Sequence, residues 1–296
     1  MKNIHSNPSP LRQKFIQYLT LHKKAERTVH AYVSFIYALA KFHRQSPDQL
    51  NSAQIEGWLF HLISERKLAP STVNIAINAL RAFFGGLLQR DIHLLLSQIQ
   101  RPKRPTRVPR PYSMAEIEKL LTLGTQGNLR ARAFLMTVYG AGLRLSEATH
   151  IRIKDLDGAR HRLLVSHPKG GHQRYTLLSE SLLVVLREYY RQAHPKDFLF
   201  PGLEPLEPMS KGTGQNIFYR AVAKAALPDK GGIHCLRHSF ATHCLENKIE
   251  ITVVQKLLGH ASLITTAGYL HVCAERLAQI QSPLGLLDLS SPLTRV

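Results

Sequence analysis

Residues 101–112 divide the chain, because their sequence, RPKRPTRVPRPY, is too rich in proline for a helix to run through it. The stretch holds four prolines and five basic residues, and no Asp or Glu occurs from position 92 to 115. Proline blocks the helix and removes a backbone donor, so the stretch is predicted to be an extended linker between a domain at 1–100 and one at 113–296. Two compatible interpretations remain, a flexible connection and a linker that lies against phosphates. Its basic residues are Arg101, Lys103, Arg104, Arg107 and Arg110.

The charge of the whole chain indicates an acidic partner. Lys and Arg number 39 against 20 Asp and Glu in 296 residues, a net charge of +19. The commonest strongly acidic partner is nucleic acid, and the alternative is a solvated basic surface. Hydrophobic residues make up 44%, which is typical of a globular protein and excludes a disordered or fibrous chain.

The sequence shows no signal peptide and no membrane span, which predicts a cytoplasmic protein without a membrane partner. The start, MKNIHSNPSPLRQKF, lacks the apolar core of a signal peptide, and no window approaches about 18 consecutive apolar residues. The three cysteines, Cys235, Cys244 and Cys273, make no disulfide framework. A reducing compartment is consistent with this cysteine usage.

The first domain, residues 1–100, is predicted to be all helical. Apolar residues recur at helical spacing in 9–23 and 27–44. A third helix is expected to be capped by Ser52 and a fourth by Ser71.

The second domain, residues 113–296, is predicted to be mainly helical with a small antiparallel β-element. Ser113 and Glu116 form the pattern of a capping box. The segment 151–178 changes to a strand pattern and contains two strands around a turn at 168–171. Helices are expected at 114–123, 129–139, 180–194, 212–226, 235–246, 251–258 and 263–280.

Two glycine-rich stretches carry candidate anion-binding cations. In GAGLRLSE, Arg144 precedes a predicted helix, whose N-terminus favours anions. In HPKGG, Lys169 lies on the predicted hairpin turn, where glycines allow close approach to a ligand. Taken singly, each residue is better explained as a solvated surface cation.

The stretch HCLRHSFATH permits two interpretations. His234 and Arg237 are three residues apart, so on a helix they share a face and could bind one oxyanion. Alternatively, His234 and His238 with Cys235 have a spacing that can bind zinc, although no CxxC or HExxH pattern accompanies them.

The stretch LLGHASLITTAGYLHV contributes His260 and Tyr269. A tyrosine on an amphipathic segment is usually half-buried in a core. Tyr269 is therefore interpreted as a nucleophile only in combination with the other candidate residues.

Taken together, these stretches resemble the tyrosine recombinase (phage integrase) family, of the simple two-domain Xer-like or transposon-borne type. The resemblance rests on GAGLRLSEA, HPKGG, HCLRHSFATHCLE and LLGHASLITTAGYLHV, and it extends along the chain. It implies an all-helical core-binding domain and a tyrosine-recombinase catalytic domain. It assigns catalytic roles to Arg144, Lys169, His234, Arg237, His260 and Tyr269, with Glu147 supporting Arg144.

The implied activity is site-specific DNA recombination through a covalent 3′-phosphotyrosyl intermediate. In the family, the tyrosine, here Tyr269, is the nucleophile, and the lysine, here Lys169, protonates the departing 5′ oxygen. Fixed cations stabilise the charge that develops on the phosphate, so no metal and no other cofactor is expected. Two alternatives remain open, a type IB topoisomerase-like enzyme and an inactive DNA-binding accessory protein.

The resemblance also implies an assembly. The expected partner is double-stranded DNA with inverted-repeat core sites. The protein is expected to be a monomer when free and to act as a tetramer on two duplexes. The leucines of the tail, residues 282–296, must be buried somewhere. They either fold back onto their own domain or dock into a neighbouring protomer.

Overall fold

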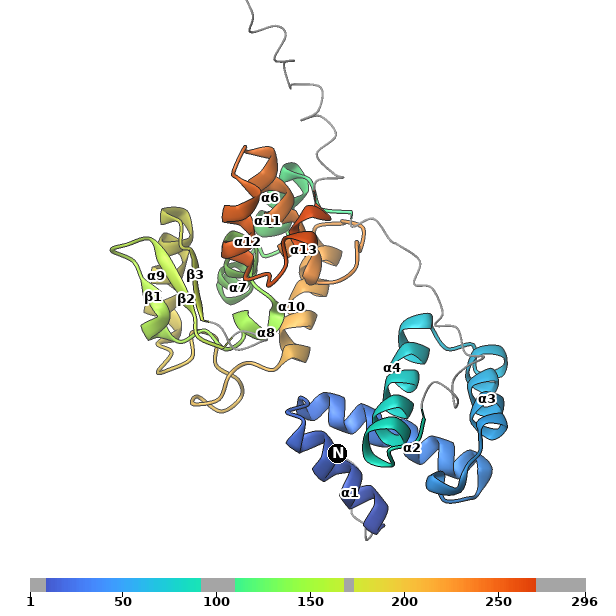
Figure 1. Cartoon of the computed structure of the whole chain (residues 1–296). Helices are drawn as coiled ribbons and strands as arrows, with labels where there is room; N and C mark the ends of the chain where they lie inside the picture. The colour runs from blue at the N-terminus through green and yellow to red at the C-terminus, as the bar shows by residue number, and fades with distance from the viewer. Residues whose placement is uncertain (1–8, 92–109, 168–172, 270–296) are drawn as a thin grey trace, which may run out of the picture. The chain divides into compact units, whose positions relative to one another are not determined.

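The computed structural model describes residues 9–91, 110–167 and 173–269. It divides into two compact units, residues 1–107 and residues 108–296, which are treated separately below (Figure 1). Of the linker stretch 101–112, only residues 110–112 lie among the described residues.

Unit 1 is helical throughout its described part, as predicted. Two of its helices, α3 and α4, continue directly into π-helical turns, η2 and η3. The elements are α1 (Pro10–Leu21), α2 (Glu26–His43), η1 (Pro47–Gln49), α3 (Ser52–Phe60), η2 (His61–Glu65), α4 (Pro70–Leu80) and η3 (Arg81–Leu87).

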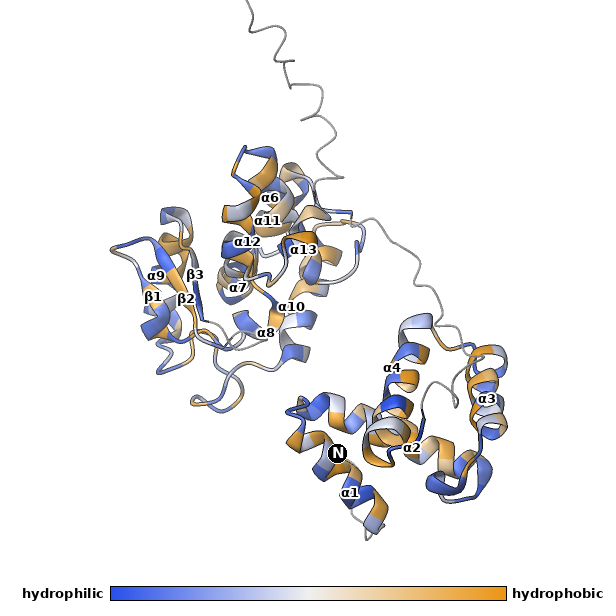
Figure 2. Cartoon of the chain, viewed as in Figure 1, coloured by the Kyte–Doolittle hydropathy of each residue, from blue (hydrophilic) through white to orange (hydrophobic). Residues whose placement is uncertain are grey.

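Each helix of unit 1 turns an apolar stripe inward. Orange and blue residues share the same helices in Figure 2, which is the amphipathic pattern of helices packed around one core. Phe15, Leu39, Trp58 and Phe83 are buried there, and the rings of Phe15 and Phe83 meet edge to face at 5.1 Å.

The starts of α3 and α4 correct two expectations. Asn51, not Ser52, caps α3. Its side chain accepts a hydrogen bond from the backbone N–H of Gln54, and the Gln54 side chain accepts one from the backbone N–H of Asn51. At α4, Ala69 occupies the cap position and Pro70 begins the helix. Proline suits that position because its fixed φ is already helical and its missing donor would be unused, so Ser71 lies inside the first turn.

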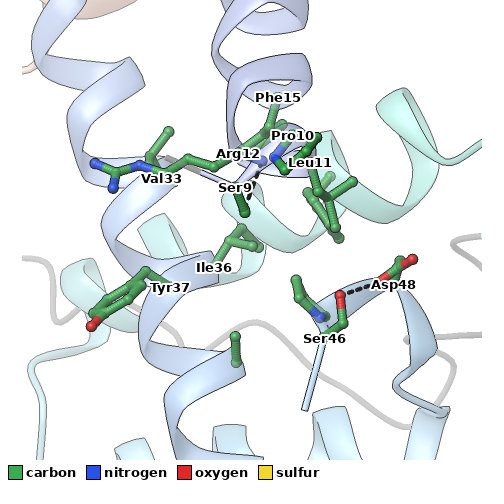
Figure 3. Close-up of a pocket in the computed structure, with 13 residues that line it drawn as sticks. Ser9, Pro10, Leu11, Arg12, Phe15, Val33, Ile36, Tyr37, Ser46 and Asp48 are labelled. Atoms are coloured by element: carbon green, nitrogen blue, oxygen red, sulfur yellow. Dashed lines mark hydrogen bonds between the residues drawn. The ribbon is translucent and has the colours of Figure 1, made fainter. Parts of the chain in front are cut away.

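A cavity of about 340 Å³ opens between α1, α2 and the turn η1 (Figure 3). Its lining is mainly apolar and includes Phe15 of α1 and Val33 and Ile36 of α2. At the rim, the Ser46 hydroxyl donates to the carboxylate of Asp48.

Unit 2 combines helices with a small sheet, as predicted. The elements are α6 (Met114–Thr122), α7 (Leu129–Gly140), α8 (Leu145–Ala148), η4 (Ile153–Asp155), β1 (Leu156–Asp157), β2 (Arg162–Val165), β3 (Arg174–Leu177), α9 (Glu180–Ala193), α10 (Lys211–Lys224), α11 (His234–Glu246), α12 (Ile251–Leu258) and α13 (Leu263–Ala267). The capping box of Ser113 and Glu116 starts α6 as expected.

The three strands form an antiparallel sheet in the order β1-β2-β3, with Leu163 opposite Thr176. The two predicted strands are present, whereas β1 was missed because two residues are too few for a period-2 pattern. The expected turn at 168–171 lies outside the described residues. The helix predicted at 263–280 is shorter than expected, since α13 ends at Ala267 and residues beyond 269 are not described.

The helix α11 lies in the middle of unit 2. Ten of its 13 residues are buried, which explains why its hydrophobic face could not be read from periodicity. The Ser239 hydroxyl accepts from the backbone of Tyr112, a fully buried residue that ends the predicted linker. That bond fixes the beginning of unit 2 against its central helix.

Within the described ranges, no helix is long and apolar enough to cross a membrane.

Gly142, in the turn between α7 and α8, allows us to predict the effect of adding one methyl group. Its φ is +60°, and a Cβ there would lie 2.4 Å from the ring of Phe240. We expect Gly142→Ala to lower the free energy of unfolding by about 1 kcal/mol for the backbone and a further 1–3 kcal/mol for the clash. Thermal or denaturant unfolding measures the loss.

Gly127→Ala is the matched control. Gly127 has a φ of +73° but open space at the Cβ position, so only the backbone cost applies. Equal losses in the two variants would show that Phe240 moves aside at no cost.

Candidate active site

The carboxylate of Glu147 is the centre of a buried ionic cluster. Its side chain is fully buried and is contacted by three guanidinium groups. Arg144 donates at 2.8 Å, Arg174 donates from two nitrogens at 2.8 and 3.0 Å, and Arg237 lies 3.5 Å away. We call these four residues the Glu147 cluster.

Local sequence explains how Glu147 reaches this position. Arg144 is the cap residue of α8, and its backbone N–H donates to Glu147 at 2.9 Å. This is the reciprocal half of a capping arrangement, in which the acidic residue three positions on satisfies the cap residue. The short helix α8 thus places a carboxylate and a guanidinium side by side.

The ionic contacts outweigh burial in setting the pKa of Glu147. Burial by itself would raise this pKa, but hydrogen bonds and charge from Arg174 and Arg144 lower it to about 2. The carboxylate is therefore ionised at neutral pH. Three positive charges against one negative charge leave the cluster with a net charge of +2, so it can attract an anion.

Arg174 was not among the residues that the sequence singled out. It lies on β3, its side chain is 9% exposed, and its Nε donates to the carbonyl of Leu257 at 2.8 Å. No local sequence pattern marks Arg174 as a site residue, because its partners Glu147 and Leu257 are 27 and 83 residues away in the chain.

Arg237 is 1% exposed and lies in the first turn of α11. It donates to the carbonyl oxygens of Gly142 at 2.8 Å and Leu258 at 2.6 Å. Burial, followed by the charge of Arg144, lowers the pKa of Arg237 to about 10. Its guanidinium therefore stays charged at neutral pH.

His260 follows α12 and is held at both ring nitrogens. Its Nε2 accepts from Arg237 at 3.0 Å, and its Nδ1 lies 3.0 Å from the hydroxyl of Thr266. Because a guanidinium only donates, Nε2 must be the acceptor and Nδ1 carries the proton. Burial and the nearby arginines lower the pKa of His260 to about 4, so this ring is neutral at pH 7.

Tyr269 lies two residues after α13 and is 5% exposed. Its hydroxyl is 2.9 Å from Nδ1 of His238, and its ring stacks at 6.4 Å on that of His260. Burial raises the pKa of Tyr269, and the charges of Arg237 and Arg144 act in the opposite direction. The hydroxyl thus lies within the field of the Glu147 cluster.

The structure therefore brings together most of the predicted site. Tyr269, His260, Arg237, Arg144 and Glu147 are linked by the contacts above. His234 lies in the same region, where the charges of Arg237, Arg144 and Glu147 act on its pKa.

Some predicted residues cannot be placed. Lys169 lies outside the described residues, as do Arg101, Lys103, Arg104 and Arg107. Arg110 is exposed.

The zinc interpretation gains no support from geometry. The rings of His234 and His238 are 4.6 Å apart. Across residues 9–91, 110–167 and 173–269, however, no group of three or more His, Cys, Asp or Glu side chains could hold a metal ion.

The Glu147 cluster predicts a large effect of Glu147→Gln. The variant keeps the shape but leaves buried guanidinium groups without a counter-charge, which typically costs about 3–5 kcal/mol of stability. Because the folded pKa is below the usual value of 4.5, the native stabilisation is present above that pH and is lost as the pH falls toward 2. We expect urea unfolding to show this acid-dependent loss in the native protein and a smaller one in the variant.

Glu116→Gln is the control for that comparison. Glu116 pairs with Lys230 at 2.7 Å, but both side chains are partly exposed, so a loss of about 1 kcal/mol or less is expected. Similar losses in both variants would contradict a special role for Glu147.

Comparison with known proteins gives two family matches. Residues 113–276 match the Phage integrase family, and residues 11–94 match the phage integrase N-terminal SAM-like domain. The first match alone covers more than half of the chain.

Relatives agree along nearly the whole length. A putative integrase/recombinase, y4qK, of Sinorhizobium fredii is 35% identical over 96% of this chain and 91% of its own. Tyrosine recombinase XerA of Pyrococcus furiosus is 31% identical over 95% of this chain and 96% of its own.

Solved structures share the fold. A crystal structure of XerA recombinase aligns at 26% identity with a TM-score of 0.53, covering 91% of this chain and 95% of that one. The XerH site-specific recombinase, bound to its palindromic difH substrate, aligns at 20% identity with a TM-score of 0.71, covering 91% and 94%. The chain with the Glu147 cluster beside Tyr269 belongs to the phage integrase family and is a tyrosine recombinase.

Proposed function

We propose that this tyrosine recombinase cleaves and rejoins double-stranded DNA with Tyr269 as its nucleophile. The observation that carries the proposal is the position of the Tyr269 hydroxyl, near two arginines whose charges act on it. Attack by Oη on phosphorus forms a 3′-phosphotyrosyl bond and breaks the bond from phosphorus to the 5′ oxygen, while the phenol proton is lost to solvent. The reverse attack by a 5′-hydroxyl of a partner strand completes strand exchange.

The proposed roles of the cations follow from charge. A phosphodiester is an anion, and attack on it builds further charge on its non-bridging oxygens. Arg144 and Arg237 are planar donor forks suited to those oxygens, and the contacts of Glu147 hold them before DNA arrives. Fixed donors of this kind stabilise developing charge without reorganising, so the proposed chemistry needs no metal or other cofactor.

The remaining residues complete the proposed chemistry. His234 is proposed to bind a phosphate oxygen, His260 to support the phosphate-binding Arg237 through its contact with that guanidinium, and Lys169 to protonate the departing 5′ oxygen. The role of Lys169 is proposed from the sequence pattern alone.

The proposed partner is double-stranded DNA at inverted-repeat sites. The net charge of +19 supports this, and solved relatives include XerH with its palindromic difH substrate and the Tn1549 integrase with circular intermediate DNA. We propose that unit 1 and the linker clamp the duplex as a core-binding domain, and that unit 2 carries the chemistry.

The assembly is proposed on the logic of the reaction. Exchange between two duplexes cuts four strands, so four protomers would act on two sites, each a monomer when free. The leucine-rich tail, residues 282–296, is the proposed contact between protomers. A cytoplasmic location is proposed because the DNA substrate is found there.

Replacing Tyr269 by Phe tests the proposed chemistry directly. Tyr269→Phe keeps the ring and removes only the nucleophilic oxygen, so covalent attachment should be abolished while duplex binding is almost unchanged. The substrate is a nicked duplex with a sequence that the protein itself selects from a random pool. Adducts that persist in the variant would show that another residue attacks the DNA.

The linker proposal predicts a change in salt dependence. Each phosphate that a cation neutralises contributes about −0.9 to the slope of log K against log salt. Replacing the five linker residues Arg101, Lys103, Arg104, Arg107 and Arg110 by Gln should therefore flatten the slope by up to about 4 to 5. An unchanged slope, measured by fluorescence anisotropy, would mean that the linker faces solvent.

A further inference from the structure

His238 is a site histidine that the proposed reaction has not used. It lies on α11 one turn after His234, so both side chains project from the same face. Its Nδ1 is 2.9 Å from the Tyr269 hydroxyl, and its ring centroid is 5.5 Å from that of Tyr269. This is direct contact with the atom proposed to attack the phosphate.

We infer that His238 orients the nucleophile by accepting the hydrogen bond of the Tyr269 hydroxyl. The inference rests on the proposed role of Tyr269. For attack, an oxygen lone pair must face phosphorus and the O–H bond must point elsewhere. An acceptor placed beside the hydroxyl on the protein side fixes that orientation before DNA binds.

The neighbouring groups are less suited to this role. Arg144 and Arg237 carry donors and no acceptor. His260 stacks on the tyrosine ring, but its Nε2 accepts from Arg237 and its Nδ1 faces Thr266. His238 presents a nitrogen to the hydroxyl at hydrogen-bond distance.

The charge state of His238 agrees with an acceptor. Burial, followed by the charges of His234 and Arg237, lowers its pKa to about 4. The ring is therefore neutral at pH 7 and has one nitrogen free of a proton. A phenol is a better donor than acceptor, so the arrangement has the Tyr269 O–H donating to Nδ1, with the His238 proton on Nε2.

Two variants of nearly equal shape test the inference. His238→Asn keeps an acceptor oxygen close to the position of Nδ1, whereas His238→Leu has the same branching and no acceptor. The measurement is the single-turnover rate of covalent adduct formation on the self-selected nicked duplex, alongside its dissociation constant. We expect Leu to slow cleavage about tenfold or more, Asn to stay within about threefold of the native rate, and both to bind DNA as the native protein does.

His243→Leu is the matched control. His243 lies on the same helix, and its Nδ1 makes an equivalent contact of 2.9 Å with the Tyr139 hydroxyl. Removing that contact perturbs α11 to a similar degree without touching Tyr269, so cleavage should be retained. Thermal unfolding of all three variants corrects for differences in folded fraction.

Three results would overturn the inference. A Leu variant that cleaves as fast as the native protein, or faster, would show that the hydrogen bond does not contribute to the cleavage rate or lowers it. An Asn variant as slow as Leu would show that the imidazole ring, not an acceptor, is needed. A His243→Leu variant as slow as His238→Leu would assign the effect to the helix. Failure of the proposed function is distinct, because the native protein would then form no Tyr269 adduct.

Discussion

A carboxylate that is fully buried needs counter-charges, and Glu147 obtains three. Each guanidinium that contacts it comes from a different part of unit 2: the cap of α8, the strand β3 and the first turn of α11. Because an unpaired charge inside a protein is very unfavourable, these elements can hardly separate while unit 2 stays folded. The requirement for neutralisation thus fixes the relative positions of the segments that carry the site.

The same guanidinium groups extend this constraint to α12. Arg174 donates to the carbonyl of Leu257 and Arg237 to that of Leu258, at the end of the helix where carbonyl oxygens lack partners within the helix. Gly259 then turns the chain with a φ of +64°, and His260 follows. Arg174 and Arg237, which are distant in the sequence, therefore help to position His260. Tyr269 stacks on the ring of His260.

Much of this arrangement was predictable from the sequence, and the exceptions have physical causes. The helical unit, the capping box at Ser113 and the two longer strands follow from local patterns, and these were predicted. Arg174 could not be found in that way because its partners are distant in the chain, and His238 was considered only as a metal ligand. Its contact with Tyr269 depends on how α11 and the segment after α13 pack, which no spacing rule describes. The cap positions at Asn51 and Ala69 were missed because the nearby Ser52 and Ser71 are also acceptable cap residues.

The helix α11 has a further consequence for how this protein can change. Most of its residues are buried in the core of unit 2, and the others include His234 and also His238, which contacts Tyr269. A single segment thus forms part of the core and also supplies residues of the candidate site, so few of its positions can vary without loss of one or the other. Unit 1 has its own separate core and carries none of these contacts. In an evolving lineage, the sequence of unit 1 is therefore free to diverge faster than that of α11.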